Sequence, residues 1–252
     1  MGLALHAQNP AIKGLPFIRS YALEDIGNVP RGTRLGFDRY GRLAVIYDAV
    51  YAVLNDSVWL NIAEKGGKDR ISIFNVAQAP DGRSYYGGSA SWGVVDVGLD
   101  GRLHPVSLLP ADAPSWIKTA VFSDLIVTPD GVYFASWNGV VYWDIKKRQN
   151  KLFEIPGDSR LVRVGNRVYI SASNHRLQLI DTNNGVLEPV EGTDLDANVV
   201  EYSTPLDSTR SLVSFEDGRL AVFDGHSVSP WPSPQRANLN GHITALEHLV
   251  DG

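Results

Sequence analysis

A short hairpin pattern recurs five times along the chain and constrains its fold more than any other feature. Each copy has an opening strand, a tight turn, two further strands and a closing acidic or amide residue. The closing residues are separated by 41, 48, 37 and 43 positions, and they are Asn55, Asp96, Asp144, Asp181 and Asp224. A drifting period of about 40 residues with several short strands per unit is typical of β-propeller blades. The sequence therefore predicts an all-β propeller of four-stranded antiparallel blades.

The turns and the alternation of apolar residues predict where each blade lies within a propeller that covers residues 11–252. Residues 243–252 have the pattern of the opening strand of a sixth blade, and residues 16–21 that of an outer strand without a blade of its own. Propellers often place an N-terminal strand in the last blade, which removes exposed sheet edges. We therefore predict about five blades plus the start of a sixth, an incomplete ring from a longer protein. The five blades are expected at about residues 30–63, 71–110, 121–156, 160–192 and 198–232.

Composition excludes several classes of function. The net charge of −5 and the pI near 5.7 argue against a nucleic-acid partner, which would need a clustered basic surface. The chain has no cysteine, so disulfides, thiolate nucleophiles and zinc–thiolate sites are excluded. No stretch approaches the roughly 20 apolar residues that span a bilayer, so we expect no membrane contact within this segment.

The first ten residues suggest export. The apolar run Gly2-Leu3-Ala4-Leu5-His6-Ala7 precedes Gln8-Asn9-Pro10, as at the end of a signal peptide with a small residue before the cleavage site. The alternative is an ordinary N-terminal tail. If residues 1–10 are a signal-peptide remnant, the protein is periplasmic.

Three segments carry a resemblance to a known family. Residues 17–28 contain Phe-Ile-Arg-Ser-Tyr and an acidic-Gly linker, and residues 35–45 contain the turn Asp38-Arg39-Tyr40-Gly41. Residues 138–144 read Asn-Gly-Val-Val-Tyr-Trp-Asp. Together they resemble the two-component regulator propeller, the extracytoplasmic sensor region of many bacterial histidine kinases. The second strands depart from the Trp-Ile-Gly-Thr usual in that family, with Ala44-Val45-Ile46-Tyr47 in the first blade.

The resemblance implies a periplasmic sensor in signal transduction. Such a segment would be non-catalytic and would pass a signal through a membrane helix to a histidine kinase domain elsewhere in the parent protein. The full-length protein would then be a homodimer.

Aromatic and amide residues in the predicted loops suggest a binding site. Loops between second and third strands and between blades gather on one propeller face, where rings can stack on sugars and amides can bind hydroxyl groups. We therefore predict a site for a small polar ligand, with a carbohydrate as one candidate. The alternative is that Trp92 and Trp137 pack between neighbouring blades. The candidate residues are Tyr47, Asp48, Trp92, Trp116, Trp137, Asn138, Asn174 and His175.

Catalysis has little support in the sequence. His242 and His248 lack the i, i+4 spacing of a helical metal pair, and no nucleophile elbow or phosphate-binding loop is present. The repeated carboxylates Asp96, Asp144, Asp181 and Asp224 are expected to accept hydrogen bonds from turn amides. We predict no enzyme activity, cofactor or metal for this segment. The alternatives are a secreted lactonase-like or lyase-like propeller enzyme and a structural protein-interaction propeller.

Overall fold

A computed structural model describes most of the chain. The described residues are 34–47, 49–56, 58–62, 71–99, 101–155, 157, 159–172, 176–191, 193 and 199–232. The predicted signal remnant at 1–10, the strand at 16–21 and the start of a sixth blade at 243–252 lie outside them.

In the described residues, twenty strands form five four-stranded antiparallel sheets, each built from four consecutive strands. This confirms the predicted propeller architecture of four-stranded blades. The first two sheets contain β1 (Arg34–Phe37), β2 (Leu43–Tyr47), β3 (Val50–Asn55) and β4 (Val58–Asn61), then β5 (Ile73–Gln78), β6 (Ser84–Gly88), β7 (Ser91–Val97) and β8 (Leu103–Ser107). The third and fourth contain β9 (Asp124–Val127), β10 (Gly131–Ser136), β11 (Gly139–Asp144) and β12 (Gln149–Glu154), then β13 (Ser159–Val164), β14 (Arg167–Ala172), β15 (Gln178–Asp181) and β16 (Val186–Pro189). The fifth contains β17 (Val200–Pro205), β18 (Ser211–Phe215), β19 (Leu220–Phe223) and β20 (Val228–Pro230). A short 3-10 helix, η2 (Ser115–Thr119), precedes the third sheet.

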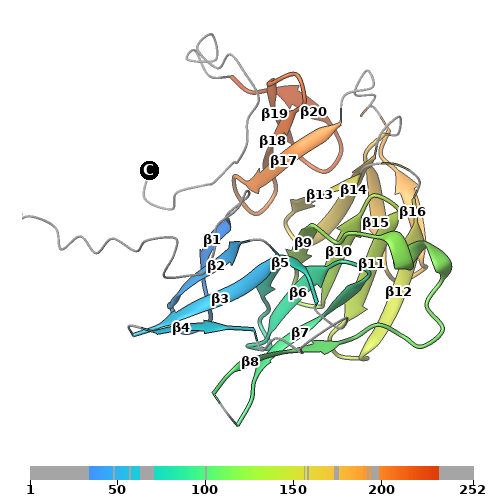
Figure 1. Ribbon diagram of the computed structural model, residues 1–252. Coiled ribbons are helices and arrows are strands. Elements are labelled where there is room, and N and C mark those ends of the chain that lie inside the picture. The colour runs from blue at the N-terminus through green and yellow to red at the C-terminus, as the bar shows by residue number, and fades with distance from the viewer. Residues whose placement is uncertain are drawn as a thin grey trace, which may run out of the picture.

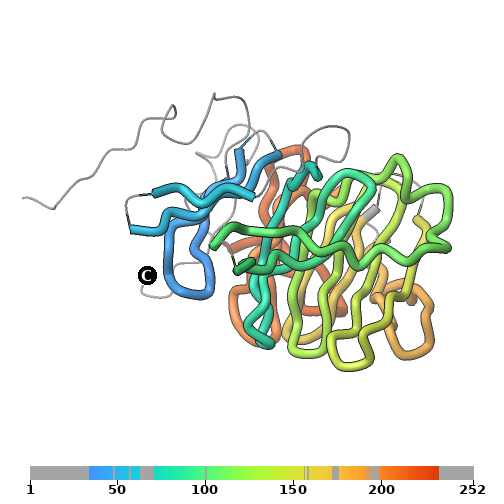
Figure 2. The backbone as a smooth tube through the Cα atoms, turned by 60° about the horizontal axis from the view of Figure 1, so that its bottom comes forward, coloured from blue at the N-terminus to red at the C-terminus, as the bar shows by residue number. Residues whose placement is uncertain are grey.

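The sheets are arranged around a common centre. In Figure 1 the first strands β1, β5, β9, β13 and β17 lie toward the middle, and the fourth strands lie at the periphery. Contacts join consecutive sheets: β3 to β5, β5 to β9, β10 to β13 and β13 to β17. The tube in Figure 2 shows the same succession from a second direction. The first strand of each sheet therefore lines the centre of the molecule.

Asp-Gly turns explain why the strands end where they do. In the hairpin between β5 and β6, the Asp81 carboxylate accepts a hydrogen bond from the amide of Arg83 at 3.0 Å. Gly82 follows with a φ of +79°, a conformation that costs glycine little. The side-chain bond holds the turn closed, so the local sequence fixes the hairpin.

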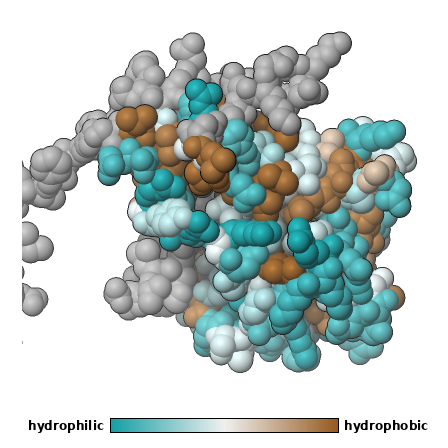
Figure 3. All heavy atoms as spheres, turned by 90° about the horizontal axis from the view of Figure 1, so that it is seen from below, coloured by the Kyte–Doolittle hydropathy of each residue, from teal (hydrophilic) through white to brown (hydrophobic). Residues whose placement is uncertain are grey.

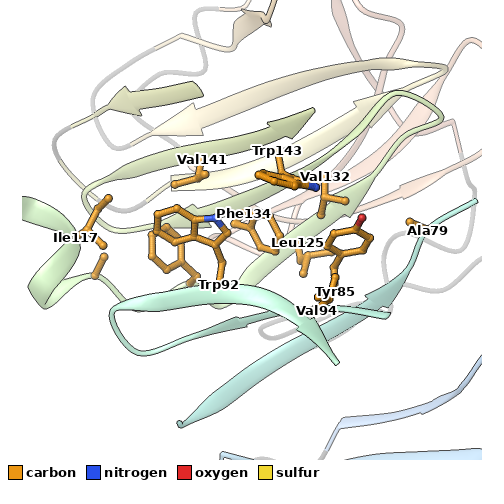
Figure 4. Packing of buried hydrophobic residues seen from close by; sticks show 12 residues of the cluster. Ala79, Tyr85, Trp92, Val94, Ile117, Leu125, Val132, Phe134, Val141 and Trp143 are labelled. Carbon is orange, nitrogen blue, oxygen red and sulfur yellow. The ribbon is translucent and has the colours of Figure 1, made fainter. Parts of the chain in front are cut away.

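Most of the core lies between neighbouring sheets. The largest cluster combines Trp92 and Tyr85 of the second sheet with Phe134 and Val141 of the third. In Figure 4 the Trp92 indole lies beside Phe134 and Val141. Burial of these apolar side chains stabilises the packing of one sheet on the next.

The first sheet differs from the others because its apolar side chains are more exposed. Leu35 and Phe37 of β1 are each 72% exposed, and Tyr40 and Val58 also face solvent. On the face shown in Figure 3, hydrophobic residues gather in the upper part and hydrophilic residues cover most of the rest.

Candidate functional site

Turns between second and third strands lie against the start of the next sheet. Ile73 donates its backbone N–H to the carbonyl of Ala49 at 2.8 Å, and Phe122 donates to the carbonyl of Gly88 at 3.0 Å. Farther along, the Ser159 hydroxyl donates to the carbonyl of Ser136 at 2.7 Å. These bonds place the turns and the connections between sheets on one face of the described structure.

Three of the predicted ligand residues come together on this face. The Asn138 amide donates to the Trp116 carbonyl at 3.5 Å and to the Thr119 hydroxyl at 3.3 Å, which ties the β10–β11 turn to η2. Trp116 is partly buried and packs on Phe122, with ring centroids 6.3 Å apart. Trp137 is 64% exposed. The patch therefore offers one open indole beside an amide that already serves a structural contact.

The remaining predicted ligand residues are buried or lie outside the described residues. Trp92 is 0% exposed, and its indole N–H donates to the side-chain oxygen of Asn150 at 3.1 Å. Its ring packs edge-on against Phe122 at 5.2 Å. Tyr47 is buried as well. For Trp92 the structure thus shows the packing role between sheets. Asp48, Asn174 and His175 lie outside the described residues.

The described structure contains a cavity at the centre of the sheets. Its volume is about 690 Å³, within the range of roughly 300–1,000 Å³ usual for small-molecule sites. All five first strands contribute to its wall, which none of the predicted ligand residues reaches. Its polar lining residues are Arg34, Tyr51, Asn75, Gln78, Ser123, Asp124, Arg160, Glu201, Tyr202 and Ser203.

Charged residues gather where the first strands begin. Arg34 and Asp124 open β1 and β9, and Arg160 and Glu201 are the second residues of β13 and β17. The first strands start on the face that carries the turns between second and third strands, so these four positions lie toward the same end of the cavity. We call this set, Arg34, Asp124, Arg160 and Glu201, the charged mouth.

Asp124 is the most constrained member of the charged mouth. One carboxylate oxygen accepts the Leu125 amide at 2.9 Å, and the other accepts the Leu161 amide of the next sheet at 2.8 Å. Burial raises the pKa of Asp124 above its usual 3.8, while the bond from Leu161 and the Arg160 and Arg34 guanidinium groups act in the opposite direction. The two guanidinium charges therefore offset part of the effect of burial on this carboxyl group.

Side-chain bonds also connect the first strands along the cavity wall. The Asn75 amide donates to the Ser123 carbonyl at 3.3 Å, which joins β5 to the start of β9. The Ser203 hydroxyl donates to the Leu161 carbonyl at 3.1 Å, which joins β17 to β13. Together with the Asp124–Leu161 bond, they connect four consecutive sheets beside the cavity.

Two strand irregularities shape this wall. The pairing of β5 with β6 shifts between Ile73 and Asn75, and that of β17 with β18 shifts between Val200 and Tyr202. Such a bulge re-aims the side chains around it. The shift in β17 falls at Glu201, which lines the cavity.

Three of the four repeated carboxylates, Asp144, Asp181 and Asp224, accept hydrogen bonds from turn amides as expected. The backbone amides of Asn184 and Asn183 lower the pKa of Asp181, and those of Ser227 and His226 lower the pKa of Asp224. Asp144 likewise accepts the Lys147 amide at 2.8 Å. For Asp96, the described residues show no such bond. Asp144, Asp181 and Asp224 therefore close turns.

The described residues hold no group of three or more side chains suited to binding a metal ion. Within that part of the chain, no helix has the length and apolar character needed to cross a membrane.

The sequence itself matches no protein-family model and no curated protein.

Comparison with solved structures identifies proteins of similar fold. The extracellular domain of a putative hybrid two-component system from B. thetaiotaomicron gives a TM-score of 0.57 at 14% identity, over 78% of this chain and 27% of that chain. An extracellular domain described as that of a putative one-component system from the same organism gives 0.58 at 13%, over the same shares. A chain of the mitotic checkpoint complex gives 0.52 at 12% identity, over 77% and 63% of the two chains. At these identities the similarity shows the fold alone, and the chain spans about a quarter of the first two proteins.

Proposed function

We propose that this propeller is the ligand-binding sensor region of a bacterial two-component signal-transduction protein, located outside the cytoplasm. The observation that carries the proposal is the central cavity of about 690 Å³, walled by the first strands of all five sheets. Its lining of charges, amides and hydroxyls suits a small polar ligand, carbohydrates included. The fold similarity to extracellular domains of signalling systems supports the cellular context.

Signalling would follow from the construction of the cavity wall. A ligand in the cavity touches strands from several sheets, and those strands are joined by side-chain bonds such as that between Asp124 and Leu161. A ligand that binds one arrangement of the sheets more tightly shifts the population toward it. In a full-length homodimer, that shift would change the arrangement of the two subunits and the activity of a histidine kinase domain.

An enzymatic propeller would need carboxylates or histidines free to act on a substrate at the cavity. Asp124 and Glu201 do line it, but both oxygens of Asp124 already accept backbone amides. No histidine occurs among the lining residues. A binding role therefore fits these groups better than general acid–base catalysis, which requires a group that is free to exchange a proton.

The test is a ligand screen with a variant that fills the cavity. Gly36 lines the cavity, and a Cβ added there would meet nothing within 4 Å, so Gly36→Leu adds bulk without a backbone clash. Ser229→Leu, at an exposed position of β20 away from the cavity, is the matched control. Purified protein is screened against small sugars, amino acids and organic acids by thermal unfolding and calorimetry. A ligand at 100 times its Kd adds about 2.7 kcal/mol of stability, or roughly 5–11 °C in Tm.

We expect a ligand that binds the unmodified chain and Ser229→Leu but not Gly36→Leu. Binding that survives in Gly36→Leu and is lost in Trp137→Ala would move the site to the patch around Trp137. A screen in which nothing binds would refute the sensor proposal.

A further inference from the structure

Glu201 and Tyr202, two consecutive residues of β17, both line the central cavity. In a regular strand, consecutive side chains point to opposite faces of the sheet. Here the pairing of β17 with β18 is shifted, because Val200 lies opposite Phe215 and Tyr202 lies opposite Ser214. Glu201 is therefore an extra residue without an opposite partner. Bulges of this kind re-aim side chains and occur often beside active sites.

The shift turns both side chains away from the core between the fourth and fifth sheets. Val200 and Phe215 are buried in that core. Tyr202 lies opposite Ser214, the neighbour of Phe215, and therefore on the other face of the sheet. Glu201 follows Val200, and alternation points its side chain to that same other face. A carboxylate and a phenol ring are thus neighbours at the cavity.

The protein itself uses neither of these two side chains. In the part of the chain that the structure describes, the Glu201 carboxylate and the Tyr202 ring and hydroxyl have no hydrogen bond, ion pair or ring contact. Tyr202 is 38% exposed, and Glu201 is partly exposed. Asp124, the other carboxylate of the wall, differs because both of its oxygens accept backbone amides. Glu201 is therefore the carboxylate that the wall leaves open to a ligand.

A carboxylate beside an aromatic ring is suited to an ammonium group. The carboxylate accepts charge-assisted hydrogen bonds from the ammonium nitrogen, and the face of the ring attracts the cation. A neutral hydroxyl group in the same place gains neither of these charge interactions. We propose that Glu201 and Tyr202 form a subsite for the ammonium group of a small organic amine. The inference rests on the proposed sensor function and adds the chemical class of the ligand.

The experiment compares molecules that differ in one charged group, by calorimetry at low salt and neutral pH. D-Glucamine is compared with D-glucitol, which has a hydroxyl group in place of the amino group. Each amino acid that binds in the ligand screen is compared with its N-acetyl derivative, which lacks the ammonium charge.

Four variants accompany these probes, and thermal unfolding shows whether each is folded. Glu201→Gln removes the charge with almost no change of shape, and Tyr202→Leu removes the ring. Arg34→Gln removes a positive charge from the same cavity wall. Glu216→Gln is the matched control, because Glu216 is exposed and does not line the cavity.

We expect the amine of a matched pair to bind about tenfold more tightly, or better, than its neutral analogue. Glu201→Gln should weaken amine binding by about tenfold or more, and Tyr202→Leu by about 2–5-fold. Glu216→Gln should change it less than about twofold, and Arg34→Gln should leave it at least as tight. Raising the salt concentration should weaken the amine and not the neutral analogue, because ions screen charge interactions.

The outcomes separate the two proposals. Equal binding of amine and neutral analogue, indifferent to Glu201→Gln but abolished by Gly36→Leu, would overturn the ammonium subsite and leave the sensor function standing. Amine binding that Glu216→Gln or Arg34→Gln weakens as much as Glu201→Gln would also overturn the subsite. If neither the probes nor any member of the screen binds, both proposals fail.

Discussion

Replacing Trp92 tests whether packing between sheets, rather than ligand contact, explains this residue. Its indole is fully buried, contacts Phe122 edge-on, and donates to Asn150, whose own amide donates to the Leu108 carbonyl at 2.9 Å. Truncating a buried tryptophan to alanine typically costs about 3–5 kcal/mol through lost burial and the cavity left behind. We therefore expect Trp92→Ala to lower the free energy of unfolding by about that amount.

The assay is urea unfolding followed by fluorescence and circular dichroism, with thermal unfolding as a second measurement. A loss of 3–5 kcal/mol corresponds to a drop in Tm of roughly 6–20 °C for a chain of this length. Trp92→Phe keeps an aromatic ring but removes the donor to Asn150, so its loss should be smaller, about 1–3 kcal/mol.

Trp137→Ala is the matched control, because that side chain is 64% exposed. Its effect on the free energy of unfolding should stay within about 0.5 kcal/mol. The packing argument is refuted if Trp92→Ala costs less than about 1 kcal/mol, or if Trp137→Ala costs as much.

Three further predictions concern the sheets and their turns. A Cβ at Gly93 would lie 2.0 Å from the Val106 carbonyl oxygen of the paired strand, so Gly93→Ala should cost about 1–3 kcal/mol in urea unfolding. Ser171→Ala removes the hydroxyl that accepts the buried Val200 amide at 3.1 Å, and should cost about 1–3 kcal/mol. Burial alone would raise the pKa of Asp38, but hydrogen bonds from a neighbouring guanidinium and the turn amides lower it below 3.8. Its contribution to stability is therefore complete above pH 3.8 and lost as the pH falls through the lowered value, so Asp38→Asn should flatten the acid limb of a Tm–pH profile.

Each of these predictions has an internal control. Gly36→Ala adds the same methyl group in open space and should leave the urea midpoint unchanged, so equal effects at Gly36 and Gly93 would contradict the steric argument. Ser229→Ala at an exposed site should stay within about 0.5 kcal/mol. An Asp38→Asn profile parallel to that of the unmodified chain below pH 4 would show that the carboxylate does not contribute as argued.

The strand order of the propeller could be predicted because its determinants are local. Asp-Gly turns such as that at Gly82 fix each hairpin from a few neighbouring residues, and the period of about 40 residues counts the units. The different surroundings of Trp92 and Trp137 could not be predicted in the same way. Trp92 is the second residue of β7 and points to the next sheet, whereas Trp137 lies in the β10–β11 turn. Only the packing of one sheet on another distinguishes them.

The cavity wall was missed for a related reason. Arg34, Asp124, Arg160 and Glu201 are far apart in sequence, and each is an ordinary polar residue near the start of a strand. The signal that could have pointed to them is a charge within the first two residues of four opening strands. That signal does not say which side chains of a strand point to the centre of the molecule. At Glu201 a bulge also changes the alternation of side chains between the two faces of the strand.

In the proposed sensor, the bonds that join the sheets beside the cavity would couple ligand binding to the arrangement of the sheets. Leu161 takes part in two of them, donating its amide to Asp124 and accepting the Ser203 hydroxyl, so one residue of β13 links three sheets. A ligand that engages Tyr202, the residue before Ser203, would act on this link directly. A ligand that binds one arrangement of the sheets tenfold more tightly than another shifts the equilibrium between them by about 1.4 kcal/mol. This is less than the roughly 3–5 kcal/mol expected for truncating a buried core residue such as Trp92. In the proposed sensor, a ligand would therefore change the arrangement of neighbouring sheets at the centre while the apolar packing between them stays intact.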